Sequence, residues 1–236
     1  MGWEVADQVV RTDAARRQLA ADVAHELRTP LAGLQAGLEE LRDGLRPADP
    51  ARLAGLHDQT LRLGRVVGDL AELSAAESAA LSLRPSDIDL AALVRSAVAA
   101  QQPALRAAGL AVHAQLPGPV PLRADPDRIH QAVTNLLANA ARYCRPGDRV
   151  TVRTSTSDGN GVVEVADTGP GIPAAELPHV FRRRWRGSGS AVVAGSGIGL
   201  AVVRELVTAH GGTVAVDSAP GGGTRFTIRL PLAPGR

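Results

Sequence analysis

The stretch LAADVAHELRTPLAGLQAGLEEL, residues 19–41, sets the first part of the fold. Large apolar residues recur in it with alternating spacings of four and three, at Leu19, Val23, Leu27, Leu31, Leu34, Leu38 and Leu41. Such a spacing lines one face of a helix of the kind that packs in bundles. At about 100° per residue, His25 lies nearly opposite this stripe, and Glu26 and Thr29 share its solvent side. We therefore expect a long helix that presents a histidine, a carboxylate and a hydroxyl.

A second amphipathic helix is expected to follow the first. The first should span residues 6–45 and end in a turn marked by Pro47 and Pro50. The second has a similar stripe and should end near residues 74–78; its stripe consists of Leu53, Leu56, Thr60, Leu63, Val67 and Leu70. Two antiparallel helices cannot bury both seams alone, so the pattern predicts a four-helix bundle formed by a homodimer.

Composition excludes several classes of protein. The formal net charge of +2 over 236 residues is too small to indicate nucleic-acid binding. A single cysteine, Cys144, rules out an internal disulfide framework and fits a reducing compartment. The longest uncharged stretch, residues 187–203, is interrupted by glycine and serine, and no signal peptide is evident. We expect a cytoplasmic chain with no membrane contact of its own, which can equally be the inner part of a longer protein.

After Leu81 the pattern changes to alternating strands and helices. Strands are expected at residues 110–116, 149–155, 162–166, 212–217 and 224–230, and helices at residues 90–106, 126–143 and 197–210. The predicted fold is α+β: a helical hairpin at residues 1–78 that forms the dimeric bundle, then an α/β sandwich at residues 79–236. Residues 75–85 are the best candidate for a linker.

Two asparagines stand out in the helix expected at residues 126–143. Asn135 and Asn139 lie one turn apart, on the side that also carries Arg128 and Arg142. Asparagine is a poor residue for a helix interior, so a pair of them needs a reason. Their amide oxygens suit Mg²⁺, which prefers oxygen ligands and keeps waters and phosphates in its shell. Two ordinary surface asparagines would explain the pattern equally well.

Three glycine-rich segments follow. Asp167-Thr168-Gly169-Pro170-Gly171-Ile172-Pro173 comes after a strand, where a fixed carboxylate could accept the amino group of adenine; an ordinary turn is the alternative. Gly195-Ser196-Gly197-Ile198-Gly199-Leu200 opens a helix, whose N–H groups and dipole favour phosphate. Gly221-Gly222-Gly223-Thr224 is better explained as a hairpin connection than as a site.

In this order, the motifs resemble the catalytic core of a two-component sensor histidine kinase over nearly the whole chain. HELRTPL, residues 25–31, is similar to the phospho-acceptor box of that family, and NLLANAARY, residues 135–143, to its asparagine box. DTGPGIP and GSGIGL, residues 167–173 and 195–200, are similar to its glycine boxes, and Phe181 with Trp185 and Arg186 to its aromatic box. The resemblance implies a Bergerat-type ATP-binding domain after the bundle.

The resemblance also implies roles for individual residues. His25 would accept the γ-phosphoryl group of ATP and pass it to an aspartate on the receiver domain of a response regulator. Glu26 would hold or remove the imidazole proton, and Thr29 would orient water when the regulator is dephosphorylated.

Within the second domain, the resemblance implies that Asn139 binds Mg²⁺ with Asn135 beside it. Arg142 would contact phosphate, Tyr143 would lie against adenine, and Asp167 would accept its amino group. Gly195, Gly197 and Gly199 would belong to a flexible lid and its hinge. The remaining residues implied in ATP binding are Gly169, Gly171, Ile172, Ile198, Leu200 and Thr224.

Two other functions remain open at this point. Glu26 and Thr29 are compatible with a signalling scaffold that binds ATP and acts chiefly as a phosphatase of its response regulator. An ATPase of the gyrase or heat-shock chaperone type would share the nucleotide fold, but such enzymes commonly have a glutamate where this helix has Asn135, and they lack the bundle. The patterns do not choose between autophosphorylation within one chain and across a dimer.

Overall fold

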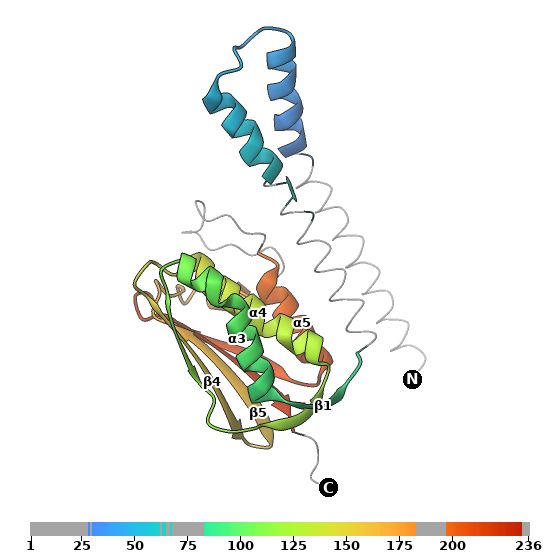
Figure 1. The fold of residues 1–236 in the computed structure, drawn as a ribbon, viewed down its shortest axis with the longest axis vertical. Coiled ribbons are helices and arrows are strands. Elements are labelled where there is room, and N and C mark those ends of the chain that lie inside the picture. The colour runs from blue at the N-terminus through green and yellow to red at the C-terminus, as the bar shows by residue number, and fades with distance from the viewer. Residues whose placement is uncertain are drawn as a thin grey trace. The chain divides into compact units, whose positions relative to one another are not determined.

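The computed structural model describes residues 28, 30–61, 63–64, 67, 83–182 and 197–232. The chain divides into two compact units, Met1–Ala71 and Glu72–Arg236. In the first unit, residues 30–42 and 50–61 are helical and are joined by a turn (Figure 1). The first helix thus ends three residues before the predicted position. The second begins at Pro50, and proline suits a first helical position because it lacks the N–H that would go unpaired there.

Close packing and polar contacts hold the two helices of the hairpin together. A Cβ on Gly37 would lie only 2.7 Å from Leu56 Cδ2, so glycine allows the close approach of the helices. Arg52 Nη1 lies 2.9 Å from Glu40 Oε2, and the Arg52 N–H donates to Asp49 Oδ1 at 2.8 Å, which caps the second helix. Within one chain the large apolar side chains stay exposed; they include Leu31, Leu38, Leu53 and Val67 of the predicted stripes.

The second unit is a mixed five-stranded sheet in the order β2-β4-β5-β7-β6. The strands are β2 (Ala111–Gln115), β4 (Arg149–Ser157), β5 (Asn160–Asp167), β6 (Thr213–Ser218) and β7 (Thr224–Pro231). Strand β2 pairs with β4 in parallel, and all other neighbours are antiparallel. A separate two-stranded sheet joins β1 (Ser86–Asp89) to β3 (Pro121–Ala124). The sheet places the end of β5 directly beside the start of β7, because Asp167 pairs with Thr224.

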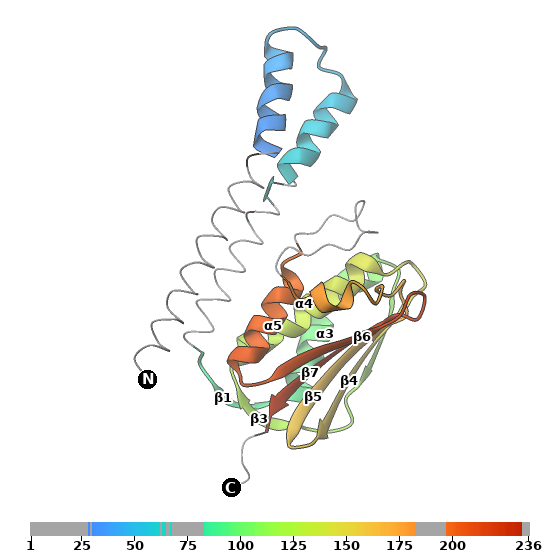
Figure 2. The same cartoon turned by 180° about the vertical axis from the view of Figure 1, so that it is seen from behind.

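Three helices cover one face of the sheet: α3 (Leu90–Ala107), α4 (Pro126–Tyr143) and α5 (Gly199–Ala209). Figures 1 and 2 show them on the same side from opposite views. Their apolar faces pack against the inward side chains of the central strands, and the largest fully buried residues are Phe226, Leu90, Leu105, Ile129, Leu136, Leu137, Leu206, Ile228 and Leu230. On α4, the side chains of Ile129, Val133, Leu136 and Ala140 are all buried.

The predicted α+β architecture is confirmed, with three helices and five strands close to their expected ranges. Strands β1 and β3 were not predicted. Each has only four residues, and their pairing joins Ser86 to Ala124, so no local alternation marks them. No helix in the described part of the chain is long and apolar enough to span a bilayer.

Candidate nucleotide-binding site

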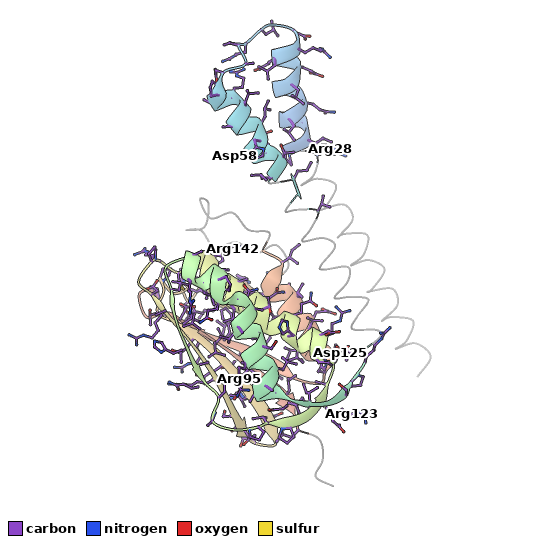
Figure 3. All side chains as sticks on the ribbon, viewed as in Figure 1. Arg28, Asp58, Arg95, Arg123, Asp125 and Arg142 are labelled. Carbon is purple, nitrogen blue, oxygen red and sulfur yellow. The ribbon has the colours of Figure 1, made fainter. Side chains whose placement is uncertain are left out.

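Helix α4 carries the polar face predicted for it. Asn135 and Asn139 are both half-buried, and Arg142 is exposed in the last turn (Figure 3). The Asn135 side chain donates from Nδ2 to the Gly199 carbonyl oxygen at 3.4 Å, a long hydrogen bond that ties the middle of α4 to the start of α5. This contact commits the amide nitrogen and leaves the Asn135 Oδ1 as an acceptor.

The start of α5 has features that suit an anion. Ile198 occupies the N-cap position, where it cannot provide a capping side chain, and no acidic residue lies in the first turn. Backbone N–H groups at such an end, with the positive end of the helix dipole, attract phosphate. Gly197 adopts φ +69°, a left-handed conformation that glycine reaches without strain, so the chain can turn into the helix there.

Asp167 is held at the end of β5 by two backbone donors. Its Oδ1 accepts the Gly169 N–H at 2.9 Å and the Thr224 N–H at 3.2 Å. Burial raises the pKa of this carboxyl above its ordinary value, and the two N–H groups only partly offset that effect. Oδ2 receives neither of these two N–H groups, so it is the oxygen that we expect to accept a hydrogen bond from a ligand.

Cys144 lies directly beside this carboxylate. It is the C-cap residue of α4, and a Cβ on Gly169 would come within 2.8 Å of its Sγ and 3.0 Å of Asp167 Oδ1. Burial raises the pKa of the thiol to about 12, and the charges of Asp167 and Asp148 and a hydrogen bond to Asp167 add to the rise. The group is therefore a neutral S–H neighbour of Asp167.

The glycine loop after Asp167 packs on the turn between β6 and β7. The Gly221 N–H donates to the Pro170 carbonyl at 2.7 Å, and the Ile172 N–H donates to Ser218 Oγ at 2.8 Å. A Cβ on Gly171 would collide with the Ala219 carbonyl oxygen. The segment at 221–224 is a hairpin connection, as predicted, but it also forms the support behind the glycine loop, which the sequence did not indicate.

The N-terminus of α4 is anchored by Asp125, a residue that the sequence analysis did not single out. Its carboxylate accepts the Arg84 N–H at 2.9 Å, the Asp127 N–H at 3.1 Å and the Arg128 N–H at 3.2 Å. Its own N–H donates to His210 Nε2 at 3.0 Å, and His210 Nδ1 lies 2.7 Å from the Leu206 carbonyl. His210 thus joins the end of α5 to the start of α4.

Several predicted site residues fall outside the described residues. They are His25, Glu26 and Thr29 of the phospho-acceptor motif, Gly195 of the second glycine segment, and Trp185 and Arg186 of the aromatic motif. Of the aromatic motif, Phe181 is described and packs edge-on against Phe226 with ring centroids 6.1 Å apart. The structure therefore brings together one half of the predicted machinery: the asparagine face, the Asp167 pocket and the start of α5.

Two family models match the chain. Residues 15–79 match the His Kinase A (phospho-acceptor) domain, and residues 124–234 match the histidine kinase-, DNA gyrase B-, and HSP90-like ATPase domain. The first covers the segment of His25, and the second covers the asparagine face and both glycine segments.

Individual relatives agree. The chain is 34% identical to the signal transduction histidine-protein kinase BaeS of Escherichia coli over 97% of its own length and 50% of that protein. It is 42% identical to the probable sensor histidine kinase TcrY of Mycobacterium tuberculosis, over 92% of the chain and 46% of that protein. It therefore spans about half the length of these relatives.

Two solved structures are also similar. The Acinetobacter baumannii histidine kinase AdeS has a TM-score of 0.67 and 29% identity, covering 89% of this chain and 98% of that one. A mycobacterial sensor histidine kinase, MprB, has a TM-score of 0.54 and 32% identity, covering 65% of this chain and 99% of that one.

Proposed function

This chain belongs to the two-component sensor histidine kinases, and we propose that it transfers the γ-phosphoryl group of ATP to His25 and then to an aspartate of a response regulator. The observation that carries the proposal is the arrangement in the second unit, where Asn135 contacts the start of α5 and Asp167 is held beside Thr224. A helix end suited to an anion and a fixed carboxylate together suit a purine nucleotide.

We assign the base of ATP to Asp167 and Tyr143, and its phosphates to Arg142 and the start of α5. The second glycine segment, Gly195, Gly197, Ile198, Gly199 and Leu200, would then surround the phosphates, and Gly169, Gly171, Ile172 and Thr224 would line the base. Asp167 Oδ2 can accept the adenine amino group, whereas guanine presents a carbonyl oxygen there and would be repelled.

The donor set also fits Mg²⁺. Among the described residues, no group of three or more His, Cys, Asp or Glu side chains could hold a metal ion. A magnesium ion at α4 would therefore depend on an amide oxygen, for which Asn139 is the candidate, and on oxygens of the nucleotide and water. When bound, the ion would neutralise phosphate charge; the protein groups position the nucleotide.

The proposed reaction at His25 is a substitution at phosphorus. An unprotonated imidazole nitrogen forms a bond to the γ-phosphorus, the bond to the β,γ-bridging oxygen breaks, and ADP leaves. Glu26 would hold the other imidazole nitrogen in position and take up its proton. His25 and the proposed nucleotide site belong to different units, so we expect the second unit to move between nucleotide binding and transfer. We place the domain boundary at residues 78–79, which the match of residues 15–79 to the phospho-acceptor domain supports.

We further propose that the chain acts as a homodimer through its helical hairpin, in the cytoplasm, where ATP is available. The exposed Leu31, Leu38, Leu53 and Val67 support the dimer, because a second hairpin would bury both apolar seams. A phosphatase activity toward the response regulator is the second candidate function. It is favoured by Thr29 within the phospho-acceptor motif and by 36% identity to a protein named a kinase/phosphatase, MprB of Mycobacterium.

Labelled ATP tests the proposal. Incubated with ATP and Mg²⁺, the chain should gain a phosphoryl group that is labile in acid and stable in base, and His25→Gln should abolish the label. Asn139→Asp should weaken labelling while the dimer stays intact in light scattering. A stable label on the His25 variant would exclude His25 as the acceptor, and unchanged labelling of the Asn139 variant would exclude its role in nucleotide binding.

A further inference from the structure

Ser218 lies behind the glycine loop, at the end of β6, and is half-buried. Three polar groups surround its hydroxyl oxygen. The Ile172 N–H donates to it at 2.8 Å, the Gly223 carbonyl lies 2.7 Å away, and Thr224 Oγ1 lies 3.0 Å away. No motif in the sequence marks this residue, and it stands behind the pocket rather than in the set of residues assigned to ATP.

The direction of each hydrogen bond follows from counting protons. A carbonyl oxygen can only accept, so the single proton of the Ser218 hydroxyl goes to Gly223. The Thr224 hydroxyl must then donate its own proton to Ser218. Ser218 thus uses its one proton and both lone pairs, and Thr224 Oγ1 keeps acceptor capacity only.

Thr224 and Asp167 lie side by side, and in the proposed function they form the wall that the base of ATP faces. Their hydrogen-bonding groups therefore decide which base edge fits there. The Thr224 N–H is committed to Asp167 Oδ1, and the two residues are direct partners in the β5–β7 register. Asp167 Oδ2 and Thr224 Oγ1 therefore both offer lone pairs and no proton. Such a wall suits a base edge that carries an amino group, or a water that donates to the base, and disfavours a carbonyl edge.

We propose that Ser218 is a positioning residue for base recognition: by taking the Thr224 proton and the Ile172 N–H, it fixes Thr224 as an acceptor and contributes to the choice of adenine. The inference rests on the proposed function, since it requires that this pocket hold the base of ATP. Ser218 does not touch the base; it acts through Thr224 and the glycine loop.

Nucleotide affinity measured by calorimetry on the full chain tests the inference, with ADP and IDP as probes. The two share their phosphates and differ in the base edge, where IDP carries a carbonyl in place of the amino group and an N1–H in place of the unprotonated N1 of adenine. Ser218→Ala should weaken ADP binding about tenfold, the equivalent of roughly one hydrogen bond to a buried group, without weakening IDP. The ratio of the two affinities should fall accordingly, because the freed Thr224 hydroxyl can turn and donate.

Three further variants sharpen the test. Ser218→Thr keeps the hydroxyl and should restore the wild-type ratio. Thr213→Ala, an exposed position on the same strand, should leave both affinities unchanged. Thr224→Val removes the second hydroxyl while keeping its backbone N–H, and should lower the ratio as Ser218→Ala does; it carries the test if the Ser218→Ala chain does not fold.

Each other outcome overturns the inference. If Ser218→Ala weakens ADP and IDP binding equally, Ser218 only supports the loop. If the ratio of the two affinities does not change, Ser218 does not fix the direction of the Thr224 hydroxyl. If Ser218→Thr fails to restore the ratio, the Ser218 hydroxyl is not the group responsible. Failure of the wild-type chain to bind ADP at all would instead refute the proposed function, on which the inference depends.

Discussion

Replacing Asp125 with alanine should destabilise the second unit from a point far from the nucleotide pocket. The side chain is 6% exposed and accepts three backbone N–H groups, two from the first turn of α4 and one from Arg84. Loss of a helix cap costs about 1 kcal/mol, and the orphaned Arg84 N–H about 1 kcal/mol more. Relief of the buried charge works in the other direction, so we expect Asp125→Ala to lower the free energy of unfolding by about 1–2 kcal/mol.

Hydrogen exchange in increasing urea would measure this loss and locate it. Amides in α4 should lose protection in Asp125→Ala by the amount of the destabilisation. In Asp125→Asn, the loss of protection should be about half of that in Asp125→Ala. The amide oxygen can still cap α4, whereas the NH₂ group would face the Arg84 N–H and could not accept from it. Asp127→Ala is the matched control, since this exposed carboxylate is in the same turn. Unchanged protection of α4 in Asp125→Ala would refute the capping role.

The contribution of Asp125 should depend on pH in a defined direction. Burial acts to raise its pKa, but the N–H groups of Arg84, Arg128 and Asp127 outweigh burial and hold the pKa below the ordinary value of 3.8. The folded state therefore binds fewer protons at this site than the unfolded state. The stability difference between wild type and Asp125→Ala should be full above that ordinary value and should decrease as pH falls through the folded pKa, because the protonated carboxyl keeps only the part of the cap that needs no charge.

Two further predictions concern the glycine loop and its neighbour. Gly171→Ala should destabilise the second unit by about 3 kcal/mol, since it adds a collision with Ala219 to the strain of a φ of +72°. Gly159→Ala, at φ +73° with open space around it, should show the strain alone, about 1–2 kcal/mol, in the same urea titration; equal losses would exclude the contact. The pKa of Cys144 is raised to about 12, so little of it is thiolate at pH 8, and it should react with a disulfide reagent roughly a thousandfold more slowly than an ordinary thiol. A rate within tenfold of that of an ordinary thiol would contradict the burial of Cys144 beside Asp167.

Local sequence was enough to place α4, because each of its ends carries its own signal. Asp125 and Pro126 are a typical cap and first residue, and Arg145-Pro146-Gly147 cannot continue the helix. The pocket residues on this helix could therefore be predicted from their spacing. The two glycine segments were recognisable for the same reason, since backbone conformations open to glycine leave a trace in composition.

The support of the site could not be predicted, because it is made of contacts between distant parts of the chain. Ser218 meets Ile172 across 46 positions, and His210 meets Asp125 across 85. A serine at the end of a strand and a histidine at the end of a helix have many ordinary explanations, and only the pairing of β6 with β7 and the packing of α5 on α4 select one. The short strands β1 and β3 were missed for the same reason.

Helix α4 connects these distant contacts, so a movement at one end of the helix affects the residues that we assign to ATP. Its first turn is fixed by Asp125 to Arg84 and, through His210, to the end of α5. Its middle contacts the start of α5 through Asn135, and its C-cap residue, Cys144, adjoins Asp167. A rigid helix held at all of these points cannot shift at one of them alone. A displacement of Arg84 that strained the Asp125 cap would therefore move the whole helix, and with it Asn139 and the contact of Cys144 with Asp167. Nucleotide affinity should accordingly change in Asp125→Ala, although Asp125 lies at the opposite end of α4 from Arg142 (Figure 3).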